Sequence, residues 1–234
     1  MSRMASTLFL SCLLLLTGCR HALAEPLPRI GIIGAGEMGG TLGRLWVNAG
    51  YSVFFASRHP QELKPLVSSL GPRAQAGSPL QAAQYGDVVV MAVPYGALPV
   101  LGKQLAGTLR GKVVLDVANP YPQRDGDIAR QALQTGSGIY SARLFPGARW
   151  VRGFNSLAAS SLAATAHQTG EEAVAVPLAG DDKGALDTVA QLTTAAGFTP
   201  VVVGGLAAAA LFQPGGPLFL HTLTADELNH AIDR

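Results

Sequence analysis

Ile30-Gly31-Ile32-Ile33-Gly34-Ala35-Gly36-Glu37-Met38-Gly39 is a short apolar run that leads into a glycine-rich turn. The glycines have the G-x-G-x-x-G spacing, which has meaning here because a strand pattern precedes it and a helix pattern follows it. In that setting Gly34 permits the tight turn, Gly36 lets the backbone approach a pyrophosphate, and Gly39 lets the helix pack against the strand. We therefore expect the phosphates of a dinucleotide at the helix N-terminus, in contact with Gly34, Ala35, Gly36, Glu37, Met38 and Gly39. The alternative is a glycine-rich turn without a ligand.

Short apolar runs alternate with helix-like stretches along the rest of the chain. The runs predict strands near residues 29–33, 52–56, 87–93, 112–116, 151–154, 174–178 and 200–203. Helices are expected at 38–49, 61–70, 98–108, 127–135, 157–165 and 183–196, with left-handed glycine caps at Gly50, Gly71, Gly136 and Gly197. Several runs are continuous in Val, Ile and Ala, which is typical of strands buried on both faces. The pattern predicts a Rossmann-type, doubly wound α/β fold with a mostly parallel sheet and helices on both faces.

The chain is expected to divide into a leader at residues 1–24, a dinucleotide-binding domain at 25–204 and a short helical C-terminal tail at 205–234. Within the tail, residues 205–211 fit a helix packed on the domain, and Gln213-Pro214-Gly215-Gly216-Pro217 is a clear break. A last helix is expected at 225–232, with Thr224 as its N-cap.

The end of the second predicted strand indicates which dinucleotide is bound. Sites specific for NAD place Asp or Glu there, to bind the ribose 2′-hydroxyl. This chain has Ser57 and Arg58 at that point, and the nearest acid is Glu62. A hydroxyl and a guanidinium would bind a 2′-phosphate through charge-assisted hydrogen bonds, whereas a carboxylate would repel it. The sequence therefore favours NADP(H). The alternative is that Ser57 and Arg58 only solvate a turn and cap the next helix.

Two further strand ends are expected at the carboxyl edge of the sheet, where ligands lie in open α/β folds. Val93 and Pro94 end the third strand, and Asn119 follows the fourth. We expect Val93 and Pro94 to lie over the cofactor, and the Asn119 amide to face the nicotinamide or the substrate. A well-formed turn without a ligand is the alternative for each.

Composition excludes several functional classes. Of 234 residues, 48% are hydrophobic and 14% charged, and a formal net charge of +2 leaves no basic stripe for nucleic acid. Both cysteines, Cys12 and Cys19, lie in the leader, so the remaining domain has no thiol for a disulfide, metal or redox pair. The five histidines are scattered without ligand spacing. We therefore predict neither a metal site nor a catalytic acid–base residue.

The leader has the pattern of an export signal. Arg3 precedes an apolar run at residues 8–16 that is too short to span a bilayer. Leu16-Thr17-Gly18-Cys19 fits the lipobox of bacterial lipoproteins, which predicts lipidation of Cys19 and a periplasmic or membrane-anchored protein. Cleavage after Ala24 by ordinary signal peptidase is an alternative. A start nearer Leu27 is another, and it would make the protein cytoplasmic.

The chain resembles the NADP-dependent reductases of the deazaflavin coenzyme F(420) and, more distantly, the NADPH-binding domain of the STEAP ferric reductases. The similar segments are 32–36, 56–58, 92–94, 116–120, 151–155, 179–182 and 196–198, in family order. The first of them are also similar to pyrroline carboxylate reductase. The resemblance implies that Ser57 and Arg58 bind the 2′-phosphate of NADP(H). The part after Gly204 departs from the family pattern, and the predicted export signal departs from the family's cytoplasmic location.

The resemblance also implies a function. In that family hydride passes directly between the nicotinamide and a flavin-like acceptor, so no acid–base side chain is needed. The expected function is an NADPH-dependent oxidoreductase with a flavin or deazaflavin as co-substrate. The alternatives are a non-catalytic NADP-binding module, such as a sensor or accessory lipoprotein, and a reductase of a small carbonyl or imine compound. The expected partner is a small-molecule hydride acceptor; a homodimer is left open, and a lipid at Cys19 would be the only membrane contact.

Overall fold

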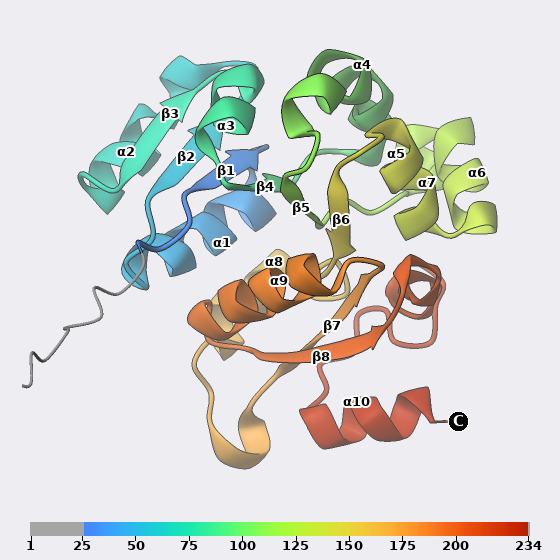
Figure 1. Ribbon diagram of the computed structural model, residues 1–234. Coiled ribbons are helices and arrows are strands. Elements are labelled where there is room, and N and C mark those ends of the chain that lie inside the picture. Colours follow the sequence, from blue (N-terminus) through green and yellow to red (C-terminus); the bar gives the residue numbers. More distant parts are fainter. Residues whose placement is uncertain (1–25, 234) are drawn as a thin grey trace, which may run out of the picture.

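A single eight-stranded sheet organises the computed structural model, which describes residues 26–233 (Figure 1). The strand order is β3-β2-β1-β4-β5-β6-β7-β8, and every neighbouring pair is parallel except the antiparallel pair of β6 and β7. The strand order changes direction between β1 and β4, which is where a doubly wound sheet binds its ligand. The predicted fold class is therefore confirmed. The strands are β1 (Ile30–Ile33), β2 (Val53–Ala56), β3 (Ala74–Gly77), β4 (Val88–Met91), β5 (Val113–Asp116), β6 (Arg149–Arg152), β7 (Ala175–Gly180) and β8 (Thr199–Gly204).

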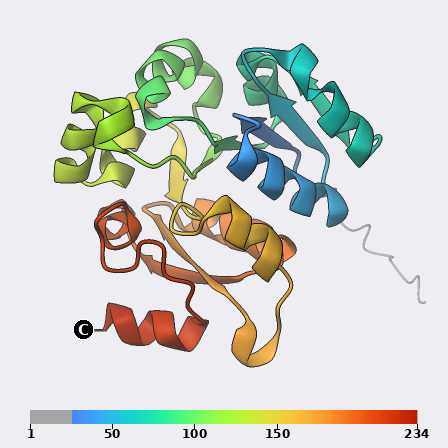
Figure 2. The same cartoon turned by 180° about the vertical axis from the view of Figure 1, so that it is seen from behind.

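Helices cover both faces of the sheet. The first face carries α1 (Glu37–Asn48), α2 (Lys64–Leu70), α8 (Ala159–Thr165) and α9 (Lys183–Ala195). The second carries α3 (Pro79–Tyr85), α4 (Leu98–Leu109), α6 (Asp127–Thr135) and α7 (Ser137–Leu144). Figure 2 shows α1 and α8 side by side on the first face. The remaining helical segments are α5 (Pro122–Asp125), α10 (Ala225–Ile232) and the 3-10 turns η1 (Pro60–Leu63), η2 (Tyr95–Ala97), η3 (Gly170–Glu172) and η4 (Leu206–Phe212).

The core follows from the strand sequences, because successive side chains of a strand point to opposite faces. In β4, Val88 and Val90 join the cluster under α1 and α9, while Val89 and Met91 join the cluster under α3 and α4. Each central strand is buried along its whole length, as its continuous apolar sequence predicts. A third, smaller cluster packs η4 and α10 against β7 and β8.

Most of the predicted elements are present, with boundaries within a few residues. The predicted glycine caps have left-handed backbones, with φ of 96° at Gly50, 77° at Gly71, 93° at Gly136 and 88° at Gly197. Thr224 caps α10 as predicted, through a reciprocal capping box with Glu227. The division into a domain at 25–204 and a tail at 205–234 stays a prediction.

Several elements differ from the prediction. Strand β3, with the sequence Ala-Gln-Ala-Gly, was not predicted, because it lacks β-branched and aromatic residues and is held by its pairing with β2. The predicted strand at 151–154 is β6 at 149–152, since Phe154 has φ of 61° and cannot continue a strand. The helix predicted at 61–70 begins as the 3-10 turn η1, and residues 206–212 form a 3-10 rather than an α-helix.

The predicted leader, with the lipidation site Cys19, lies outside the described residues. Among residues 26–233, no helix is long and apolar enough to cross a bilayer.

Candidate functional site

The glycine turn after β1 has the geometry that its sequence predicts. Gly34 has φ of 101°, and a Cβ built there would lie 2.2 Å from the carbonyl oxygen of Ala92. A Cβ at Gly39 would lie 2.0 Å from the carbonyl oxygen of Gly34, so its absence lets α1 pack against the turn. At Gly36 the same Cβ would meet no atom within 4 Å. Gly34 and Gly39 are therefore required by the fold itself, whereas Gly36 faces open space that a ligand can fill.

The first turn of α1 supplies free donors beside Gly36. The backbone N–H of Gly40 already donates to the Gly36 carbonyl at 2.7 Å, so the helix is regular from its first turn. Gly36 makes no side-chain cap, which leaves the N–H groups before Gly40 available to an anion. Glu37 is exposed, while Ala35 and Met38 are partly buried against the core.

A hollow of about 590 Å³ opens beside the glycine turn, between α1 and the segment 62–69. Gly36 and the acidic residues Glu37 and Glu62 are among the residues that line it. Arg44 lines its wall and donates to the Ser69 hydroxyl at 3.3 Å. The glycine turn and the start of α2 therefore line the same hollow.

Ser57 and Arg58 follow β2 at the carboxyl edge, next to the glycine turn. The register pairs Ile33 at the end of β1 with Ala56 at the end of β2, so the two turns begin at the same level. The Ser57 hydroxyl accepts the backbone N–H of His59 at 3.1 Å and keeps its own hydrogen free to donate. Arg58 is exposed, and within residues 26–233 it makes no ion pair. Both groups can therefore reach a phosphate in front of the edge.

Val93 and Pro94 lead from β4 into a turn that is anchored by Tyr95. Val93 is partly buried and Pro94 exposed. The buried Tyr95 hydroxyl donates to the Ser137 carbonyl at 3.0 Å and accepts the Ser141 hydroxyl at 2.9 Å. Burial raises the pKa of Tyr95 above its ordinary value, followed by the effect of the nearby Asp116 carboxylate. Tyr95 is consequently a neutral structural group whose hydroxyl is committed to α7.

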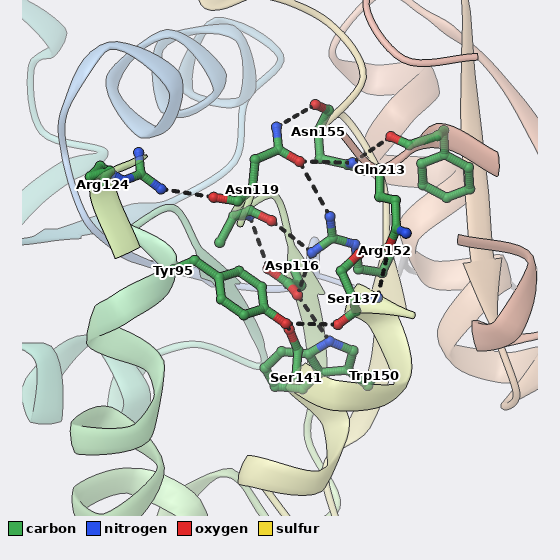
Figure 3. A network of polar contacts seen from close by, with 12 residues as sticks. Tyr95, Asp116, Asn119, Arg124, Ser137, Ser141, Trp150, Arg152, Asn155 and Gln213 are labelled. Carbon is green, nitrogen blue, oxygen red and sulfur yellow. Dashed lines mark hydrogen bonds and ion pairs between the residues drawn. The ribbon is translucent and has the colours of Figure 1, made fainter. Parts of the chain in front are cut away.

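Asn119 lies at the carboxyl edge as predicted, but its amide is used within the chain. Its Nδ2 donates to the Asn155 carbonyl at 2.7 Å, and its Oδ1 accepts the Nδ2 of Asn155 at 3.2 Å (Figure 3). Asn155 Nδ2 also donates to the carbonyl of Phe212 at 2.8 Å. One hydrogen of Asn119 Nδ2 is left for a ligand, so the amide mainly ties the loop after β5 to the loop after β6.

The sequence reasoning missed the ion pair beneath this loop. Asp116 and Arg152 are register partners at the ends of β5 and β6, fully buried, with Arg152 NH1 donating to Asp116 Oδ2 at 2.8 Å. The Nε1 of Trp150 donates to the same carboxylate oxygen at 3.3 Å. A signal was present, because Asp116 ends an apolar strand and Arg152 lies within the next predicted strand. The sequence alone does not show that these two strands are neighbours in the sheet.

No group of three or more His, Asp, Glu or Cys side chains in the described part of the chain is arranged to hold a metal ion.

The strand order and the glycine turn place the protein in the class of dinucleotide-binding Rossmann-type domains, and the basic residue after β2 favours NADP(H) within that class. Comparison with known proteins agrees with this class: residues 29–120 match the family model described as NADP oxidoreductase, coenzyme F(420)-dependent. This match, together with the relatives described next, supports the resemblance of the chain to the F(420)-dependent NADP oxidoreductases.

Individual relatives cover different shares of the chain. A hypothetical protein of Sinorhizobium meliloti, SMa0349, is 32% identical with a TM-score of 0.74, over 85% of this chain and 96% of that one. A protein of Arthrobacter sp. described as an F(420)-dependent NADP reductase is 25% identical with a TM-score of 0.66, over 78% and 87%. The rat metalloreductase STEAP3 is 33% identical over 185 residues, 78% of this chain. The chain spans 35% of the length of STEAP3.

Proposed function

We propose that the protein transfers hydride between NADP(H) and a flavin-like or deazaflavin acceptor. The observation that carries the proposal is the pair of turns at the ends of β1 and β2. Gly36 leaves open space at the N-terminus of α1, and the neighbouring β2 is followed by Ser57 and Arg58 instead of an acid. The first turn fits a pyrophosphate and the second fits a 2′-phosphate.

Different residues of the site would bind different parts of NADP(H). The N–H groups of the first turn of α1 bind the pyrophosphate, and the Ser57 hydroxyl and Arg58 guanidinium bind the 2′-phosphate. Val93 and Pro94 lie beside the next part of the cofactor along the edge, followed by the loop that contains Asn119. When bound, the nicotinamide supplies the hydride. The chain itself has only to bind, orient and shield the reacting rings.

The acceptor class is supported by the state of Tyr95. Reduction of a carbonyl or imine needs a proton donor, and Tyr95 lies shortly after the end of β4 at this edge. Its side chain is fully buried, and its hydroxyl donates to a backbone carbonyl rather than facing the edge. A flavin-like acceptor takes hydride without a protein proton donor, so it is the class that agrees with this geometry.

The choice of cofactor is tested by the dissociation constants of NADPH and NADH for wild type, Arg58→Ala and the double variant Ser57→Asp/Arg58→Ala. A hydrogen bond to a charged group contributes about 1.5–3 kcal/mol, so Arg58→Ala should weaken NADPH roughly ten- to a hundredfold. Solvent screening at the exposed Arg58 favours the lower end. NADH should change little, and the double variant should reverse the preference, because Asp repels the phosphate and accepts from the ribose hydroxyl.

A matched control for the lost charge is Arg73→Ala. Arg73 is also exposed but directly precedes β3, at the opposite edge of the sheet. It should leave both dissociation constants unchanged at fixed salt. If Arg58→Ala weakens NADH and NADPH equally, Arg58 does not read the 2′-phosphate.

Turnover separates an enzyme from a binding module. NADPH oxidation should appear when flavins, the deazaflavin or quinones are supplied, and its rate should persist when each histidine is replaced in turn. Tight NADPH binding with every acceptor inactive would favour the non-catalytic module. Dependence on one histidine would point to acid–base chemistry and to a different acceptor.

We also propose that the protein is exported and lipidated at Cys19. The support is the sequence Leu16-Thr17-Gly18-Cys19 after a short apolar run. The expressed precursor should be processed and labelled by a lipid analogue, and Cys19→Ser should abolish the label. An unprocessed cytoplasmic product would contradict this proposal and leave the cofactor proposal untouched.

A further inference from the structure

The buried pair of Asp116 and Arg152 lies directly beneath the loop after β5. Both side chains have no solvent exposure. Bringing two charges out of water is costly, and apolar residues of the same size often give equal or greater stability. A buried pair at a strand end is therefore weak evidence for stability. Its contacts instead indicate what it holds in place.

The pair fixes both polar groups of one backbone unit. Arg152 NH1 donates to the Ala118 carbonyl at 2.7 Å, and Asp116 Oδ1 accepts the Ala118 N–H at 2.9 Å. Arg152 NH2 lies 3.5 Å from Asn119 Oδ1, which adds a weaker contact to the next residue. Figure 3 shows the guanidinium between the Asp116 carboxylate and the Asn119 amide. The path of the loop is thus determined by a side chain from the neighbouring strand.

The loop after β5 lies at the carboxyl edge of the sheet, where ligands bind in open α/β folds. The register pairs Ile33 with Met91, and Met91 with Asp116, so β1, β4 and β5 end at one level. The glycine turn and Ser57 lie on the β1–β2 side, where the adenosine half of a dinucleotide is bound. The loop after β5 lies on the other side of the point between β1 and β4 where the strand order changes direction, and the nicotinamide half extends to that side.

We propose that Arg152 is a positioning residue that holds residues 117–120 as a fixed wall for the nicotinamide half of NADP(H). This inference rests on the proposed function. The Arg152 side chain is fully buried, so it acts through the Ala118 backbone and the Asn119 amide. The adenosine half has its own contacts on the β1–β2 side, so its binding does not depend on Arg152.

The test compares a whole cofactor with its adenosine half. Adenosine 2′,5′-bisphosphate and NADPH are titrated into wild type, Arg152→Met and the double variant Asp116→Leu/Arg152→Met. The double variant removes both charges together, so no uncompensated charge is left buried if the single variant fails to fold. The emission spectrum of bound NADPH reports the surroundings of the nicotinamide without any turnover.

The expected result is a split between the two ligands. NADPH should bind about tenfold more weakly to the folded variants, with emission shifted toward that of free NADPH, which corresponds to a free-energy loss of about 1.4 kcal/mol. Adenosine 2′,5′-bisphosphate should bind as it does to wild type. Arg149→Ala is the matched control, because Arg149 lies on the same strand β6 but pairs with the partly exposed Asp182. It should change neither ligand nor the spectrum.

Two outcomes overturn the inference while the cofactor proposal stands. One is unchanged NADPH affinity and emission in the folded double variant. The other is equal weakening of both ligands, which would mean a general structural role. If wild type binds neither ligand, the proposed function fails, and the positioning role fails with it.

Discussion

Replacement of Gly36 by Val separates cofactor binding from folding. Gly36 has φ of −73°, which any residue adopts, and a Cβ there meets no atom within 4 Å. The free energy of unfolding should therefore fall by less than about 1 kcal/mol, the scale of a lost helix cap. The valine side chain would occupy the space of the pyrophosphate and break its hydrogen bonds to the first turn of α1. Loss of about 3 kcal/mol corresponds to roughly a hundredfold weaker NADPH binding.

Gly39→Ala provides the matched contrast three residues further on. Its Cβ would lie 2.0 Å from the Gly34 carbonyl oxygen, so α1 must move away from the turn. Overpacking of this kind costs about 1–3 kcal/mol of stability. Urea denaturation measures both stabilities, and fluorescence titration measures the NADPH dissociation constant. A folded Gly36→Val protein with wild-type affinity would refute the phosphate site, and a large stability loss at Gly36 would refute the assignment of free space.

Three further predictions concern stability. Asp182 has its pKa lowered from 3.8 to about 2, first by its hydrogen bond from Arg149, so its stabilising effect is complete above pH 3.8 and is lost as pH falls through about 2; in Arg149→Ala, titration by NMR should show that pKa move back toward 3.8. Trp46→Phe removes a buried 2.8 Å hydrogen bond to the Leu192 carbonyl and some core volume, so urea denaturation should show a loss of about 2 kcal/mol. Thr224→Ala removes the N-cap of α10 and should cost about 1 kcal/mol in the same assay, whereas Thr224→Ser should restore most of it.

The fold was predictable because its signals are local. A continuous apolar strand, a glycine turn and a helix pattern specify one β–α unit, and their repetition specifies a parallel sheet. Strand β3 and helix α3 were both missed, but for different reasons: β3 has no clear signal in its sequence, whereas α3 has one that was overlooked. Strand β3 has no intrinsic strand preference, but Ser78 and Gln81 form a capping box that the sequence already displays before α3. A search for that box, rather than for apolar periodicity, would have found α3.

The candidate site was predictable in its backbone part and less so in its side chains. The spacing of Gly34, Gly36 and Gly39 specifies distances along one chain segment, so the turn could be derived from sequence. The role of Asn119 depends on Arg152 at the end of β6 and on Asn155 in the loop after it, both more than thirty positions along the chain. The sequence alone does not show that pairing, so the prediction that the Asn119 amide faces the nicotinamide or the substrate was made without it.

The same network extends to the segment after Gly204. The Phe212 carbonyl accepts Asn155 Nδ2, and Gln213 Oε1 accepts the backbone N–H of Ser137 at 2.8 Å. Removal of this segment would leave the Ser137 N–H without its acceptor and Asn155 Nδ2 with only its 3.2 Å bond to Asn119 Oδ1, at a cost of about 1–3 kcal/mol for each lost hydrogen bond. Because Asn155 also forms hydrogen bonds with Asn119, removal of the segment would also disturb the loop after β5 at the carboxyl edge of the sheet. The C-terminal segment is therefore part of what fixes the loop that contains Asn119, even though it contains none of the residues predicted to bind the cofactor.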